Sequence, residues 1–279
     1  MPDHRGIVVG VLSWNLFHGR DYPPDPALRS WRSRLLGLSE RDPTHVQINR
    51  PLRREFVSWL AGRQWEIALL QEAPPRWYRD LRERCQADGR IALTSRNFLP
   101  GLRGALAEWN PDLMASNEGG SNQLLVRRPA RVVESRSLTL ARLPERRRML
   151  WTRLEVPGGR SLCVATLHAT SNDRDVSARE LARAAAWAVD WAGQTPLILG
   201  GDFNLRPRER PEAFASLEER FGLAGATSPG AIDHVLARKL RMVDRPRALP
   251  PEEREVPGPG GLRIRLSDHA PVVASFGMK

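Results

Sequence analysis

Short apolar runs that end in polar residues recur along the whole chain. Runs of this length, bounded by Gly, Pro, Asn or Asp, are typical of β-strands. The pattern predicts strands in GIVVGVLSWN, EIALLQE, NQLLVRR, RVVESRSLTL, RRMLWTRLEV, SLCVATLHAT, LILGG, AIDHVLA and the end of SDHAPVVASF. The turn sequence PGG between RRMLWTRLEV and SLCVATLHAT indicates a hairpin.

Segments with apolar positions every three or four residues are interleaved with these runs. They predict helices in ALRSWRSRLLGL, PLRREFVSWLAG and SARELARAAAWAVDWAG, and at residues 77–85 and 212–221. Residues 97–120 and 246–261 are rich in Gly, Pro or Asn, and we expect loops there. The order of strands and helices favours a mixed sheet, or two sheets, covered by helices.

Length and composition limit the class of protein. A chain of 279 residues that is 41% hydrophobic can bury one large core, so we expect a single domain over residues 1–279. No apolar run approaches the roughly 20 residues of a membrane span, and IVVGVLSW is too short for a signal peptide. Cys85 and Cys163 form neither a metal motif nor a disulfide framework. We therefore expect a cytoplasmic monomer without a transmembrane segment.

The charge raises the question of a polyanionic partner. The formal net charge is +11, and only two of the 43 basic residues, Lys239 and Lys279, are lysines. Phosphates attract clustered arginines, so nucleic acid is one candidate. A coding bias that writes Arg at surface positions explains the same numbers, and charge alone leaves both explanations open.

Polar residues with catalytic potential stand at the ends of several predicted strands. Taken singly, an Asn or Asp in such a place is most often a turn former. Asp202 and Asn204 are stronger candidates, because two-residue periodicity turns both to one face while Phe203 points into the core. We expect one rim to collect the whole set: Asn15, Glu72, His168, Asp202, Asn204, Asp233, His234, Asp268 and His269.

The motifs that carry these residues resemble the endonuclease/exonuclease/phosphatase superfamily, which includes pancreatic deoxyribonuclease. They are LSWNLFHGRD, LLQE, ATLHAT, LGGDFNLRP, IDHVLA and SDHAPV, in this order over nearly the whole chain, and GDFN with a terminal SDH is the most specific combination. The resemblance implies an α/β (α+β) fold, a four-layer α/β/β/α sandwich of two mixed sheets flanked by helices. It also implies hydrolysis of a phosphoester.

The resemblance implies a metal site as well. Glu72 is the best candidate ligand, Asn15 would help through its amide oxygen, and Asp268 would face the metal or His168. Carboxylate and amide oxygens suit Mg²⁺ or Mn²⁺ better than Zn²⁺. We therefore expect a Mg²⁺- or Mn²⁺-dependent enzyme.

Roles for the other rim residues follow from the same resemblance. His269 is the leading general base, and Asp233 would orient it. Asp202 would orient the attacking water, and whether Asp202 or His269 takes the proton stays open. His168 and Asn204 would donate hydrogen bonds to phosphate oxygens.

The chain departs from the family pattern near its start. Phe17 stands where many members carry an acidic residue, which puts a second metal contact there in doubt, and the segment between Asn15 and Glu72 is long. His18, Arg20 and Arg127 are candidates for contact with the substrate, with loop packing as the alternative for His18.

Three functions remain open. The first is a nuclease acting on DNA or RNA, and the second is a phosphoesterase acting on a lipid headgroup, an inositol phosphate or another small phosphoester. The third is a non-catalytic binding module, which the full set of catalytic residue types disfavours. Since one fold carries many substrates, the sequence does not choose among phosphoesters.

Overall fold

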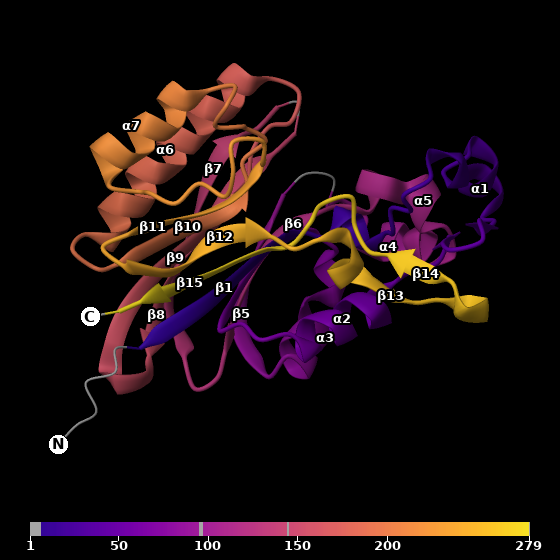
Figure 1. Cartoon of the computed structure of the whole chain (residues 1–279), viewed down its shortest axis with the longest axis horizontal. Coiled ribbons are helices and arrows are strands. Elements are labelled where there is room, and N and C mark those ends of the chain that lie inside the picture. The colour runs from indigo at the N-terminus through magenta and orange to yellow at the C-terminus, as the bar shows by residue number, and fades with distance from the viewer. Residues whose placement is uncertain (1–6, 95–96, 144, 279) are drawn as a thin grey trace.

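Two β-sheets packed face to face form the centre of the protein (Figure 1). The structure is a computed structural model and describes residues 7–94, 97–143 and 145–278. The larger sheet has the strand order β12-β15-β1-β4-β6-β5, with bounds Arg241–Ala248, Val272–Gly277, Val8–Asn15, Ile67–Ala73, Ser121–Arg127 and Ala87–Leu93. The smaller sheet has the order β11-β10-β9-β8-β7, with bounds Asp233–Arg238, Leu197–Asp202, Arg160–His168, Arg147–Val156 and Arg131–Ala141.

Apolar side chains fill the space between the two sheets. Ile67 and Leu69 of the larger sheet share one buried cluster with Val164 and Ile198 of the smaller sheet. Gly200 lies where the two sheets come close, since a Cβ atom at this position would stand only 2.7 Å from Cδ1 of Leu69. The buried run LILGG therefore lies between two covered faces, as its sequence predicts.

Helices cover the outer face of each sheet. Helices α2 (Arg53–Gly62) and α3 (Tyr78–Arg84) bury Phe56 and Leu81 against the larger sheet, in one cluster with Trp14 of β1. Helices α6 (Arg174–Ala192) and α7 (Pro211–Phe221) cover the smaller sheet (Figure 1). The predicted four-layer α/β/β/α sandwich is confirmed.

A lobe of short helices projects from the sandwich (Figure 1). It contains α1 (Trp31–Leu36), α4 (Pro100–Trp109) and α5 (Pro111–Met114), and the Asn110 amide joins it by donating to the Arg34 carbonyl at 2.8 Å. Two short ladders flank it, β2 (Glu40–Arg41) with β3 (Val46–Gln47), and β13 (Glu255–Pro257) with β14 (Arg263–Arg265). The long segment between Asn15 and Glu72 supplies α1, β2, β3 and α2.

The structure corrects some predicted elements. Residues 97–120 are not mainly loop, because they hold α4 and α5, and a proline at the first position of each starts the helix rather than breaking it. Strands β5 and β12 have too many charged residues to show an apolar run, and the sequence did not reveal them. Cys85 and Cys163 are buried free thiols. Among the described helices, none is both long and apolar enough to cross a membrane.

Candidate active site

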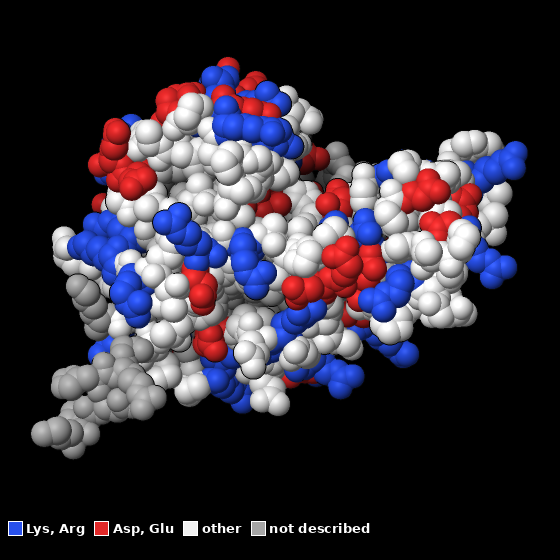
Figure 2. Space-filling view, viewed as in Figure 1, with Lys and Arg blue, Asp and Glu red and all other residues white. Residues whose placement is uncertain are grey.

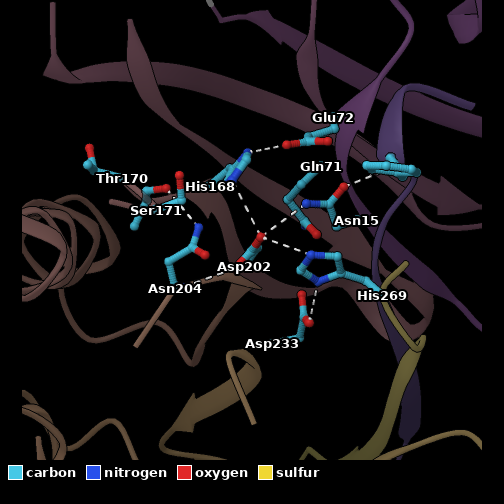
Figure 3. A network of polar contacts seen from close by, with 12 residues as sticks. Asn15, Gln71, Glu72, His168, Thr170, Ser171, Asp202, Asn204, Asp233 and His269 are labelled. Atoms are coloured by element: carbon cyan, nitrogen blue, oxygen red, sulfur yellow. Dashed lines mark hydrogen bonds and ion pairs between the residues drawn. The ribbon is translucent and has the colours of Figure 1, made fainter. Parts of the chain in front are cut away.

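Strand register places three of the predicted residues in one row. Strand β10 pairs with β9 so that Asp202 lies opposite His168, and with β11 so that Asp202 lies opposite Asp233. The larger sheet meets this row at the end of β1, where the Asn15 amide donates to Oδ2 of Asp202 at 3.0 Å (Figure 3). Residues distant in sequence therefore form one rim where the two sheets end. His234 is not part of it, because its ring is buried against Phe203 and Phe214 on the helix side of the smaller sheet.

Local backbone geometry fixes the position of Asp202 in this row. Gly201, just before it, has a φ of 141°, and a Cβ there would stand 2.0 Å from the Leu167 carbonyl oxygen of β9. Only glycine allows strands β9 and β10 to approach so closely. Phe203 is buried against the helices, as the alternation predicts, and the Asn204 backbone N–H donates to Oδ1 of Asp202 at 3.0 Å.

A bulge brings Glu72 to the rim. In a regular strand Glu72 would share the face of Leu70, which packs in the core under α2. The pairing of β4 with β6 shifts between Leu70 and Ala73, and Glu72 has a φ of 46°. Positive φ angles at non-glycine residues recur around the site, at Phe17, His18, Asn204 and Ser267. Strain of this kind concentrates at functional sites.

His269 and Asp233 form a hydrogen-bonded pair. Nδ1 of His269 lies 2.7 Å from Oδ2 of Asp233, which leaves Nε2 pointing to Asp202, 3.8 Å from its Oδ2 (Figure 3). Although burial opposes the change, Asp233 and Asp202 raise the pKa of His269 well above 6.5. Burial and the neighbouring Asp233 raise the pKa of Asp202. The two carboxylates therefore stabilise the imidazolium that forms when His269 takes up a proton.

The loop that carries His269 is tied to strand β1. The Ser267 hydroxyl donates to the Asn15 carbonyl at 2.7 Å and accepts from the His269 backbone N–H at 3.0 Å. The indole N–H of Trp14 donates to the His269 carbonyl at 2.9 Å. These bonds hold the imidazole against the rim.

Arg147 fixes both the tautomer and the protonation state of His168. An arginine N–H only donates, so the contact of 3.1 Å between Nη1 of Arg147 and Nδ1 of His168 leaves Nδ1 without a proton. Burial and Arg147 lower the pKa of His168 to about 3, so the ring is neutral at neutral pH. Its one N–H is at Nε2, 3.4 Å from Oδ2 of Asp202. His168 is therefore a fixed donor facing the centre of the rim.

Glu72 lies between two histidines. Its carboxylate oxygens are 3.3 Å from Nε2 of His18 and 3.7 Å from Nδ1 of His168. Burial would raise the pKa of Glu72, but the positive charge around it lowers the pKa instead. Burial also lowers the pKa of both His18 and His168, so Arg147 is the permanent cation among these neighbours. Glu72 is ionised at the edge of a cavity of about 190 Å³.

The residues at Glu72 fit a hard divalent cation. Burial raises the pKa of Asp268, and the charge of Glu72 raises it further, so a cation between the two would relieve repulsion. Oδ1 of Asp268 is buried and has no hydrogen-bond partner within the described chain. Oδ1 of Asn15 accepts from the Phe17 N–H at 2.9 Å and keeps a second lone pair. Oxygen donors of this kind suit Mg²⁺ or Mn²⁺.

A second grouping of possible ligands overlaps the histidine pair. One donor atom from each of Asp202, Asp233 and His269 lies within 4.8 Å of the others. A cation there would take Nε2 of His269 or disrupt its bond to Asp233, and His269 would then be no base. The two metal positions therefore predict different effects of the same substitutions.

The structure places the three residues predicted to contact the substrate in three different environments. His18 is buried against Glu72, and the Arg20 side chain lies in the lobe, 3.9 Å from Asp112. The prediction that Arg127 contacts the substrate is wrong. Its guanidinium donates to the carbonyls of Leu60, Ala61 and Arg63 at the end of α2. It stacks on Trp65 and satisfies helix carbonyls, away from the rim.

Some residues that build the site were not found from the sequence. Arg147 is one arginine among many, and only the fold brings it to His168. Trp14 reads as an ordinary core residue. Ser267, in contrast, belongs to the SDH motif. Its position directly before Asp268 and His269 was a signal that could have identified it.

Comparisons with known proteins agree with this architecture. The catalytic domain of human Nocturnin superposes with a TM-score of 0.64 at 17% identity, covering 98% of this chain and 95% of that one. A mannosyl-6-phosphatase from Bacteroides thetaiotaomicron has a TM-score of 0.64 at 14% identity, covering 97% and 100%. D. rerio TDP2 complexed with a single-strand DNA product has a TM-score of 0.60 at 14% identity, covering 97% and 99%.

At these identities the likeness shows the fold alone. A search of curated proteins found no match. The sequence of residues 12–269, nearly the whole chain, matches a family described as Endonuclease/Exonuclease/phosphatase family. The match includes every predicted rim residue from Asn15 to His269, and the chain belongs to the Endonuclease/Exonuclease/phosphatase family.

Proposed function

We propose that this chain is a metal-dependent phosphodiesterase that cleaves nucleic acid. The observation that carries the proposal is the His269 imidazole, bonded to Asp233 at Nδ1 and left open at Nε2, 3.8 Å from Asp202. This is the arrangement of a general base and the carboxylate that orients it. The gap between Nε2 and Asp202 suits a water molecule held by both groups.

The rim residues divide the work of hydrolysis. Nε2 of His269 takes a proton from the water, whose oxygen bonds to phosphorus. The bond to the leaving oxygen breaks, its electron pair stays on that oxygen, and the leaving oxygen takes a proton from solvent. Asp202 orients the water, and the Nε2–H of His168 donates to a phosphate oxygen. A divalent cation held by Glu72 and Asp268, with help from Asn15, would neutralise charge on the phosphate.

Support for a nucleic acid substrate comes from two directions. The TDP2 structure with a single-strand DNA product shares this fold, and the chain has a net charge of +11. Figure 2 shows basic and acidic side chains interspersed on the face it presents, so on that face the charge forms no single basic stripe. The rim supports the hydrolysis of a phosphoester, and the nucleic acid substrate rests mainly on the likeness to TDP2.

A small phosphoester is the second candidate. It is favoured by the likeness to a mannosyl-6-phosphatase and by the small volume of the cavity at Glu72, about 190 Å³. An inositol phosphate or a lipid headgroup belongs to the same class of substrate.

A substrate panel tests both candidates. Purified protein with Mg²⁺ or Mn²⁺ is given single-stranded DNA, duplex DNA, RNA, mannose 6-phosphate, an inositol phosphate and bis(p-nitrophenyl) phosphate. The proposal expects strand cleavage that is abolished by EDTA and by His269→Ala. His45→Gln is the matched control, because His45 also pairs with a carboxylate, Glu255 at 3.0 Å, but lies outside the rim. Full cleavage in excess EDTA, or by His269→Ala, contradicts the proposal.

A further inference from the structure

A second polar cavity lies beside the rim, inside the lobe. It has a volume of about 370 Å³, and its walls include Phe17, Arg20, Tyr22, Arg29, Arg34 and Asp112. We call it the lobe pocket. Most of its wall comes from the long segment between Asn15 and Glu72, in which the sequence predicts His18 and Arg20 as candidates for contact with the substrate.

Arg20 is buried in the lobe pocket without a full set of partners. Its side chain is 9% exposed, and Nε makes one long hydrogen bond of 3.4 Å to the Phe17 carbonyl. Nη1 lies 3.9 Å from Oδ1 of Asp112, beyond the roughly 2.8 Å of a charged hydrogen bond. The guanidinium nitrogens of Arg20 that make no hydrogen bond are open to the pocket, where an anion can complete their bonds.

Two further arginines, Arg29 and Arg34, line the same pocket, and both are exposed. In the part of the chain that the structure describes, the guanidinium groups of Arg29 and Arg34 form no hydrogen bond or ion pair with protein groups. Arg29 stacks on Tyr22 with 4.0 Å to the ring centroid, and Arg20 stacks on Phe17 with 3.7 Å. Stacking holds a guanidinium plane in place while its N–H edges stay available to an anion.

The charges of the pocket do not cancel. Asp21, which also lines it, is protonated at neutral pH because burial raises its pKa to about 8. Asp112 is the remaining acid, and Gln47 already donates to it. Three arginines against one aspartate leave a net charge of about +2, which matches the charge of one phosphate group.

The lobe pocket connects directly to the rim. The Arg20 carbonyl accepts from the Ser267 N–H at 3.0 Å, and the backbones of Asp21 and Leu266 form an isolated antiparallel β-bridge. Ser267 is the residue that holds the His269 backbone. The charges of Glu72 and Asp268 raise the pKa of Arg20, which burial lowers, so these groups lie within electrostatic reach.

We infer that the lobe pocket binds a second phosphate of the substrate, while the phosphate to be cleaved lies on the rim. The inference rests on the proposed function and narrows it to substrates with two phosphates, such as a nucleic acid strand or an inositol bisphosphate. Arg20, Arg29 and Arg34 are the specificity-determining residues.

Binding without metal tests the pocket independently of catalysis. Thymidine 3′,5′-bisphosphate and thymidine 5′-monophosphate are titrated calorimetrically in EDTA. The wild type is expected to bind the bisphosphate roughly tenfold more tightly, the size of effect expected for charged hydrogen bonds to one phosphate. Arg29→Gln/Arg34→Gln is expected to remove the difference. Arg32→Gln is the control, because Arg32 lies on the same helix as Arg34 and is likewise exposed but does not line the pocket, and this variant is expected to keep the difference.

Kinetics then identify the source of the second phosphate. The p-nitrophenyl ester of thymidine 5′-phosphate is compared with its 3′-phosphorylated form, and inositol 1-phosphate with inositol 1,4-bisphosphate. A preference for the 3′-phosphorylated ester assigns a nucleic acid strand, and a preference for the inositol bisphosphate assigns a small phosphoester. Equal binding of the two thymidine nucleotides by the wild type overturns the inference, whatever the kinetics. Failure to hydrolyse any of the four compounds, with the binding difference intact, contradicts the proposed function and leaves the pocket assigned.

Discussion

The catalytic rim and the lobe pocket are neighbours, but they hold their polar groups in opposite ways. On the rim, strand register and hydrogen bonds fix the groups, and His269, His168 and Asp202 each contact another protein side chain. In the lobe pocket, the guanidinium groups of Arg29 and Arg34 have no hydrogen-bond or ion-pair partner among the described residues. Groups already bound to each other are prepared for a reaction, whereas unpaired cations are prepared for an anionic ligand.

This difference separates chemistry from selectivity. A change on the rim should lower the hydrolysis of every substrate by a similar factor. A change in the lobe pocket should alter only the preference for a second phosphate. The predictions below compare the two regions in that way.

The largest expected effect is that of His269→Ala. Removing a general base costs roughly 10²–10⁴-fold in turnover. The factor should be the same for the p-nitrophenyl ester of thymidine 5′-phosphate with and without a 3′-phosphate, because the base does not touch the second phosphate. Steady-state kcat for both compounds checks it, and a loss confined to the bisphosphate would remove the distinction between the two regions.

Glu72→Gln should weaken metal binding. The substitution removes the ionised carboxylate at the proposed metal position, so we expect at least roughly tenfold weaker Mn²⁺ affinity. Electron paramagnetic resonance of free Mn²⁺ measures it without any substrate. His269→Ala is the control and should bind Mn²⁺ nearly as well as the wild type. The reverse result, with loss of binding in His269→Ala alone, would move the metal to Asp202, Asp233 and His269.

The catalytic rim could be predicted from the sequence, whereas the lobe pocket could not. The rim residues stand at strand ends within motifs, and register aligns strand ends, so Asp202, His168 and Asp233 could be grouped before the structure was known. The lobe pocket depends on irregular chain. Arg20 and Arg34 meet there only because short helices and a left-handed turn at Phe17 and His18 fold back on the rim.

The same physical limit applies to the fold. Apolar runs revealed the core strands, because burial on both faces requires such runs. Apolar positions every three or four residues revealed the helices of the two outer layers, because such a helix buries one face. Strand β12 is an edge strand with two register shifts and charged side chains, so no pattern marks it. The prediction of functional residues has the same limit. Arg127, a polar residue at a strand end, was predicted to contact the substrate, but it caps a helix instead.

Arg147→Met should release the tautomer of His168. Without the donor at Nδ1, the proton is free to occupy either ring nitrogen, and we expect roughly tenfold lower turnover, within the range of effects for groups that orient a functional side chain. The ¹⁵N chemical shifts of His168 in histidine-labelled protein report the tautomer directly. Arg147→Lys keeps a donor and should preserve the Nε2–H form in part. An unchanged His168 spectrum in Arg147→Met would show that Arg147 does not set the tautomer.

The smallest effect, on stability alone, concerns Asp21 in the lobe. Burial, with Asp112 adding to it and Arg20 opposing it, raises the pKa of Asp21 from 3.8 to about 8. The folded state then binds a proton that the unfolded state releases above about pH 4, so its stability falls as the pH rises toward 8, by up to about 1.4 kcal/mol per pH unit.

Asp21→Asn should flatten that dependence. The amide oxygen still accepts from the Ile48 N–H, a bond of 2.8 Å in the wild type, but the side chain no longer ionises. Urea unfolding of both proteins at pH 5 and pH 8 gives the comparison. The variant should gain stability relative to the wild type at pH 8, and parallel losses in the two proteins would show that Asp21 is ionised in the folded state.

The central claim is that Asp233 and His269 act as one unit on the rim. A carboxylate that orients a base contributes nothing to the reaction once the base is absent, so the two losses cannot multiply. The decisive measurement is the single-turnover rate of the wild type, Asp233→Asn, His269→Ala and the double variant on the same phosphodiester. We expect the double variant to be about as slow as His269→Ala, with Asp233→Asn less impaired. Strictly multiplicative losses would contradict the pair and assign the role of base to Asp202.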